Sequence, residues 1–107
     1  MSSTREQKEV QLREHTHKTV VALLSINEDT YDNVIVVSEC RRIAIDIGNL
    51  MAPQLYGNRV HGIGNAVSVC VRLCSEALFW LDMLPDKPKH VIEAVETLVG
   101  YLSMPTL

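Results

Sequence analysis

The stretch IGNAVSVCVRLCSEALFWLDML, residues 63–84, determines the fold class of this chain. Its apolar side chains recur at alternating spacings of four and three residues, which is the pattern of one face of an amphipathic helix. Further apolar residues widen this face until it covers more than half of the helical circumference, so we expect the helix to lie at the centre of a bundle. The residues of the repeating face are Ile63, Val67, Cys70, Cys74, Ala77, Leu81 and Leu84.

Residues 30–52 precede this helix and are ambiguous when read locally, because their β-branched runs are also typical of strands. The phase of the apolar residues favours a helix, since the charged residues gather on a separate arc and a strand would not sort them in that way. Asp29 or Thr30 is expected to cap its start, and Pro53 and Gly57 are expected to end it in a loop. The apolar face consists of Val36, Cys40, Ile43, Ile47 and Leu50.

The two ends of the chain are expected to differ in character. Residues 1–18 are almost wholly polar and begin with the capping-box pattern STRE, so we predict a polar helical or frayed N-terminal arm there. The composition changes at Thr19, and residues 19–107 are predicted to form a single helical domain whose core begins at Val20. Pro88 is expected near the start of a last helix. The apolar stripe of that helix consists of Val91, Val95, Leu98 and Leu102.

Together these segments predict an all-α fold, a small four-helix bundle in which residues 30–52 and 63–84 form a long antiparallel hairpin. The apolar faces of these two helices are wide for four short elements to cover. This width favours a homodimer in which one of the two helices meets its copy. The alternative is a monomer whose four helices close around a generous core.

Composition narrows the classes of function. The chain has 107 residues, enough for one domain, and ten basic against thirteen acidic side chains give a net charge of -3. This balance argues against binding of nucleic acid or of an anionic membrane, both of which depend on clustered Lys and Arg. We find no leader-like segment and no apolar run near the roughly 20 residues that span a bilayer. The three cysteines are expected to be free thiols, so we expect a cytoplasmic protein.

The sequence carries no catalytic or cofactor-binding pattern. Cys70 and Cys74 share one helical face and could supply two zinc ligands, but a structural zinc site needs four and no second pair has a suitable spacing. Both lie on the apolar face, where a free cysteine behaves as a small hydrophobic residue. Residues 61–65, HGIGN, lack the lysine and the serine or threonine of a phosphate-binding loop. We therefore expect no enzyme activity, no metal site and no cofactor.

Phe79 and Met83 are the anomaly of the central helix. They are spaced i,i+4 and project from its polar arc, with Trp80 at the border. Large apolar side chains on a polar face form a patch, and such patches commonly mark interaction sites, so we predict a partner-binding surface here unless another helix covers it. Its anchors are Phe79, Trp80 and Met83, with Arg72 and Glu76 as a polar rim. An alternative partner-binding surface on the first helix consists of Val20, Val21 and Leu24.

The segments SECRRIAID, residues 38–46, and VRLCSEALF, residues 71–79, belong to the two helices of the predicted hairpin. Their apolar spacing and small residues resemble the small two-helix hairpin proteins of pseudomonads, which include an anti-activator of LuxR-type quorum-sensing transcription factors. The resemblance implies a helical protein that sequesters the ligand-binding domain of the activator and blocks its dimerisation. No diagnostic motif carries the resemblance, and no site residue is transferred from it.

The expected function is therefore non-catalytic protein binding, as an anti-activator that occupies the ligand-binding or dimerisation surface of a bacterial transcription activator. The alternative is a small DNA-binding or phage-encoded regulator. The gap between the second and third helices exceeds the usual turn of about three or four residues in a helix-turn-helix, which argues against that alternative. Val67, Val69 and Val71 also stand where base-reading side chains would be needed. The sequence leaves open whether self-association and partner binding share a surface.

Overall fold

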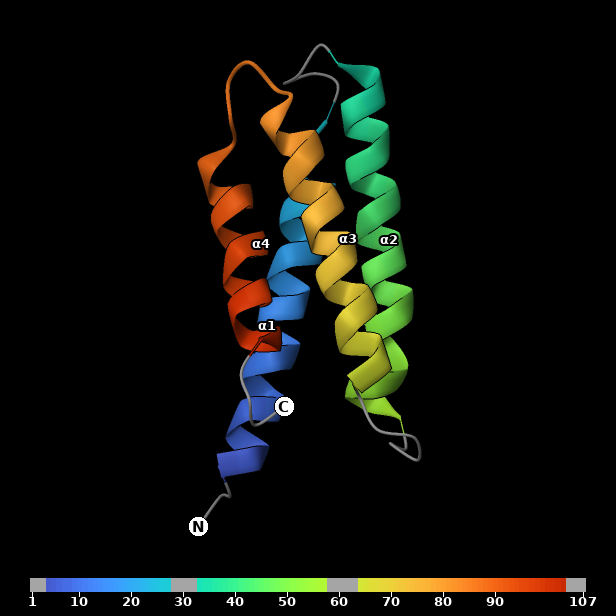
Figure 1. The fold of residues 1–107 in the computed structure, drawn as a ribbon, viewed down its shortest axis with the longest axis vertical. Coiled ribbons are helices and arrows are strands. Elements are labelled where there is room, and N and C mark those ends of the chain that lie inside the picture. The colour runs from blue at the N-terminus through green and yellow to red at the C-terminus, as the bar shows by residue number, and fades with distance from the viewer. Residues whose placement is uncertain (1–3, 28–32, 58–63, 104–107) are drawn as a thin grey trace.

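The computed structural model describes residues 4–27, 33–57 and 64–103, and this part of the chain contains four α-helices (Figure 1). It contains no strand, so the predicted all-α fold is confirmed and the ambiguity of residues 34–47 is resolved in favour of helix. No helix in the described part of the chain is both long and apolar enough to cross a membrane. The helices are α1 (Thr4–Leu24), α2 (Val34–Tyr56), α3 (Gly64–Asp82) and α4 (Lys89–Leu102).

The helices run alternately up and down, and helices adjacent in the chain are also neighbours in space (Figure 1). Contacts join α1 to α2, α2 to α3, α3 to α4, and α4 back to α1, which closes the four helices into a bundle. The long antiparallel hairpin predicted from the sequence is therefore present as α2 and α3. In this arrangement the α1–α2 edge of the bundle lies opposite the α3–α4 edge.

The predicted apolar faces of α2, α3 and α4 form the core. All four residues of the α4 stripe are buried, while Leu50 of α2 and Val67 of α3 are only half-buried. Leu84 is buried although it follows the end of α3, and Ile63 lies outside the described residues. The buried residues of the α2 and α3 faces are Val36, Cys40, Ile43, Ile47, Cys70, Cys74, Ala77 and Leu81.

Both ends of α2 differ from the prediction. The helix begins at Val34, where the side chain of Asn33 accepts a hydrogen bond of 3.1 Å from the Val36 amide. This is an N-cap supplied three or four residues later than expected; residues 29 and 30 lie outside the described part. At the other end the helix continues through Pro53 to Tyr56. Pro53 has no backbone N–H to donate to the carbonyl one turn earlier in the helix. Because Pro53 is exposed, that carbonyl can form a hydrogen bond with water instead.

The first helix corrects the expectation that the core begins at Val20. α1 is continuous across the change of composition at Thr19, and its buried positions start earlier, at Leu12. Thr16 and Thr19 are also buried, and their hydroxyl groups donate to the carbonyls of Leu12 and His15 at 2.7 and 2.8 Å. These bonds satisfy the hydroxyl groups inside the bundle. The side of α1 that faces the core is therefore partly polar in sequence. This polarity is the reason why residues 1–18 were predicted to form a polar arm.

We predict from this packing that residues 1–18 contribute to stability through Leu12. Leu12 is 1% exposed, so Leu12→Ala should lower the free energy of unfolding by about 2–5 kcal/mol. Val10 is 43% exposed, and Val10→Ala should change it by only about 0.5 kcal/mol. Urea denaturation followed by circular dichroism measures both. Equal and small effects of the two substitutions would show that this half of α1 does not pack on the bundle.

Candidate functional site

Phe79 in the last turn of α3 and Met83, directly after the end of α3, project into solvent. They are 55% and 52% exposed, so neighbouring helices leave more than half of each side chain uncovered. Trp80 is half-buried and packs against the core, and its ring meets that of Phe79 edge-to-face, with centroids 5.3 Å apart and an interplanar angle of 85°. Such edge-to-face pairs are attractive. Trp80 therefore supports Phe79 from the side while remaining partly accessible itself.

Ile35 of α2 extends this exposed apolar surface, and the sequence analysis did not identify it. Arg42 of α2 lies 3.6 Å from Glu76 of α3, and this contact shows the register of the two antiparallel helices. Ile35 precedes Arg42 by seven residues and Met83 follows Glu76 by seven, so both lie about 10 Å from that ion pair toward the same end of the bundle. Ile35 is 66% exposed. We call Ile35, Phe79, Trp80 and Met83 the apolar patch.

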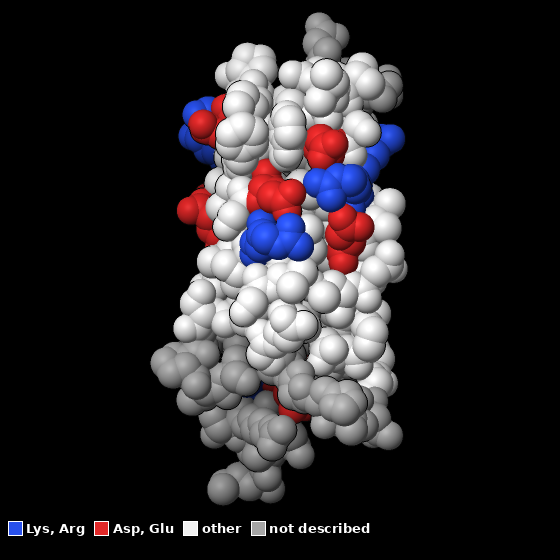
Figure 2. Space-filling view, turned by 45° about the vertical axis from the view of Figure 1, so that its right-hand side comes forward, with Lys and Arg blue, Asp and Glu red and all other residues white. Residues whose placement is uncertain are grey.

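A network of ion pairs borders the apolar patch. Arg42 pairs with Glu39 at 2.9 Å and Asp46 at 2.8 Å within α2, and with Glu76 across the helix boundary at 3.6 Å. Glu76 also pairs with Arg72 at 3.2 Å, so the two predicted rim residues lie together on the same face of α3 as Phe79. Figure 2 shows acidic and basic side chains gathered in a band, with uncharged surface above and below it. Exposed pairs of this kind contribute little stability.

A shallow groove runs between α3 and α4 on the other side of Phe79. It encloses about 450 Å³ and is open to solvent. Its apolar surface comes from Leu78 and Phe79 of α3 and Ile92 of α4, and Asp82 and Glu96 supply carboxylates. Asp82 pairs with Lys87 at 2.6 Å, whereas Glu96 has no ion pair among the described residues. The groove is therefore apolar with an acidic edge.

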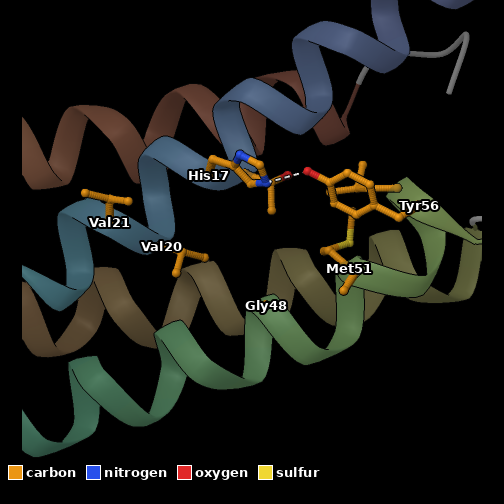
Figure 3. Close-up of a pocket in the computed structure, with 9 residues that line it drawn as sticks. His17, Val20, Val21, Gly48, Met51 and Tyr56 are labelled. Atoms are coloured by element: carbon orange, nitrogen blue, oxygen red, sulfur yellow. Dashed lines mark hydrogen bonds between the residues drawn. The ribbon is translucent and has the colours of Figure 1, made fainter.

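The alternative surface on α1 lies beside a different cavity. Val21 and Leu24 are 66% and 46% exposed, and Val20 is half-buried. Val20 and Val21 line a pocket of about 260 Å³ between α1 and α2, whereas Leu24 is not part of its wall (Figure 3). The structure thus separates the three residues of the alternative surface, two at a concave site and one on open helix surface.

The three cysteines are buried and free. Burial, with a smaller contribution from the charge of Glu39, raises the pKa of Cys40 to about 11. A hydrogen bond with Cys70, together with burial, raises the pKa of Cys74. Within residues 4–27, 33–57 and 64–103, no three His, Cys, Asp or Glu side chains gather in a way that could hold a metal ion. The thiols therefore act as small apolar side chains in the core.

The exposure of Phe79 and Met83 predicts that their removal spares the fold. The double substitution Phe79→Ala with Met83→Ala should lower the free energy of unfolding by about 1 kcal/mol or less. Leu81→Ala, in the same helix at 0% exposure, should cost about 2–5 kcal/mol and is the matched control. Chemical denaturation of the three proteins measures the difference. A double-variant cost comparable to that of Leu81→Ala would place the pair in the core.

The raised pKa of Cys40 predicts slow thiol chemistry in the folded state. At pH 8 a thiol of pKa about 11 is ionised to roughly one part in a thousand, about 200-fold less than a free cysteine. Alkylation of Cys40 by iodoacetamide, followed by mass spectrometry of the peptides, should therefore be at least this much slower in native protein than in urea. The rate should rise as the pH approaches 11. Equal rates in native and denatured protein would show that Cys40 is accessible and readily ionised.

Comparisons of this chain with protein-family models, with curated proteins and with solved structures gave no match.

Proposed function

We propose that the protein is a non-catalytic binding protein and that the apolar patch is its contact surface for a protein partner. The observation that carries this proposal is the exposure of Ile35, Phe79 and Met83 on a bundle whose core is already closed by other residues. Aromatic and methionine side chains are effective interface anchors because they bury large apolar areas and adapt to their surroundings. Apolar patches of this kind on a protein surface often mark interaction sites.

The groove beside Phe79 indicates which kinds of side chain the partner should present. Leu78 and Ile92 offer an apolar surface, and Glu96 offers a carboxylate without an ion pair among the described residues. An amphipathic helix or hairpin with apolar anchors flanked by Lys or Arg would complement both features. A partner with acidic flanks would be repelled from the same groove.

The proposed biological role is that of an anti-activator of a bacterial transcription activator. It is supported by the resemblance of the α2–α3 hairpin to small helical anti-activators of LuxR-type regulators and by the exposed patch on that hairpin. Binding to the ligand-binding or dimerisation surface would withdraw the activator from its DNA-binding state by mass action. The role needs neither a catalytic group nor a cofactor.

Self-association is the second part of this proposal. One chain already covers most of the wide apolar faces of α2 and α3, so a homodimer would use apolar side chains that stay exposed, such as those of the apolar patch. Light scattering on the purified 12.0-kDa chain measures the dimer directly. If Phe79→Ala with Met83→Ala converts a dimer to a monomer, self-association and partner binding share the patch.

The partner-binding role predicts a selective loss of repression. Co-expression of the protein with a LuxR-type activator from the same genome should lower an activator-dependent reporter. Phe79→Ala with Met83→Ala should restore the reporter signal and abolish co-purification of the activator, because interface anchors of this kind typically contribute 2 kcal/mol or more each, about 30-fold in affinity. The two substitutions should leave helicity unchanged.

The alternative surface provides the matched control. Val21→Ala with Leu24→Ala removes two exposed apolar side chains from α1 and should leave both readouts unchanged. The reverse pattern, with loss of binding only in the α1 variant, would move the contact surface to α1. Salt-sensitive binding of the purified protein to duplex DNA would instead favour a DNA-binding regulator.

A further inference from the structure

The pocket between α1 and α2 has a composition unlike that of the apolar patch. Its walls are mostly apolar, with Val20 and Val21 on α1 facing Met51, Ala52 and Leu55 on α2, while Thr16, His17 and Tyr56 supply polar atoms. We propose that it binds a small molecule with an unbranched alkyl chain of about eight carbons and one hydrogen-bonding head group. This site is separate from the proposed partner surface, which lies on α3 and the adjoining faces of α2 and α4.

Gly48 makes the pocket possible. It lies in the middle of α2 and lines the pocket, as Figure 3 shows. A Cβ atom built at this position would meet no atom within 4 Å, so close helix packing does not require a glycine there. A glycine inside a helix is destabilising relative to alanine. Its effect here is to leave open a volume that a larger side chain would occupy.

The size and shape of the pocket select the ligand. Its volume is about 260 Å³, whereas a dry protein cavity of about 150 Å³ holds benzene, with six heavy atoms. By the same ratio the pocket holds about ten heavy atoms. Its α2 wall extends from Gly48 to Tyr56, about 12 Å along the helix, and the pocket is partly open to solvent, so it is an elongated trough between the two helices. An extended alkyl chain fits this shape better than a compact ring.

One end of the pocket is polar. The Tyr56 hydroxyl and the Nε2 atom of His17 are hydrogen-bonded at 2.9 Å and bridge α2 and α1, as the dashed line in Figure 3 marks. The guanidinium carbon of Arg13 lies 5.6 Å from the centroid of the Tyr56 ring. Tyr56 is 62% exposed, so the pair stands at the solvent side, where a hydroxyl or carboxylate head group could join it. The alkyl chain would then point along the aliphatic walls toward Val20 and Val21.

A series of straight-chain alcohols tests the proposal. Butan-1-ol, hexan-1-ol, octan-1-ol and decan-1-ol would be titrated into the full chain, with backbone amide NMR shifts as the readout. Each buried methylene should tighten binding about fourfold, so octanol should bind roughly 200-fold tighter than butanol. The gain should stop between octanol and decanol because the pocket is then full. The largest shifts should be those of Val20, Gly48 and Met51.

Matched glycine variants locate the binding. Gly48→Leu should weaken octanol binding at least tenfold, since its side chain occupies the open volume. Gly100→Leu on α4 is the control, because a Cβ there also meets no atom within 4 Å, and it should bind octanol as the unmodified chain does. Gly48→Ala gives the same test with an intermediate loss if the leucine variant fails to fold. Tyr56→Phe should weaken octanol binding about fivefold by removing one hydrogen-bonding group.

Any of four results would overturn the proposal. A gain in affinity that continues unchanged through decanol would indicate unspecific partition onto the surface. Shifts centred on Phe79 and Met83, or equal effects of Gly48→Leu and Gly100→Leu, would place the alcohol elsewhere. An absence of saturable alcohol binding, together with loss of partner capture in Gly48→Leu, would show that a side chain of the partner protein fills the pocket. A parallel titration with octanoate in place of octanol tests the head group alone, because the alkyl chain is unchanged and Arg13 can interact with the carboxylate.

Discussion

The packing of the apolar face of α2 against that of α3 is the constraint on which the rest of the structure depends. Small residues are frequent on both faces, with Cys40 and Ala44 on α2 and Cys70, Cys74 and Ala77 on α3, all fully buried. Small side chains at a helix contact allow the axes to approach closely. The hairpin then presents a continuous apolar surface, and α1 and α4 close it by contacting one partner each and one another. The three cysteines serve this packing as small side chains, and their burial contributes to the raised pKa values of Cys40 and Cys74.

Once the core is closed, some apolar side chains remain outside it, either exposed on the surface or around an unfilled space. The two proposed sites lie at these positions. On the hairpin side, Phe79, Met83 and Ile35 stay exposed beside an ion-pair network that joins α2 to α3 through Arg42. On the neighbouring face, α1 and α2 meet imperfectly around Gly48 and leave a cavity instead of a protrusion. A protruding patch is suited to a protein surface, and a mostly apolar cavity is suited to a small molecule. The two sites share α2, so occupancy of one can bias the other only through that helix.

Part of the candidate site could be predicted from the sequence. The positions of Phe79 and Met83 on the polar arc of their helix follow from helical phase, and their exposure agrees with it. Ile35 could not be assigned to the same surface, because that assignment requires the register between α2 and α3, which the Arg42–Glu76 contact supplies. The pocket could not be predicted from the sequence either, although two of its lining residues, Val20 and Val21, belong to the alternative surface named there. A cavity depends on how two helices fail to fill the space between them, and the sequence of one helix does not show which residues of the other helix face it.

The sequence by itself determined which segments are helical and which faces of α2, α3 and α4 are buried, because those properties depend on the spacing of apolar residues along one chain segment. Tertiary structure decided the remainder. It turned the polar first half of α1 into a packed helix, since Leu12 and the self-satisfied hydroxyl groups of Thr16 and Thr19 can be buried once a neighbouring surface exists. It also carried α2 beyond Pro53, whose exposed position lets water replace the lost hydrogen bond. The local spacing of residues determines whether a segment is helical, but whether a polar face of that helix is buried depends on the neighbouring helices that pack against it.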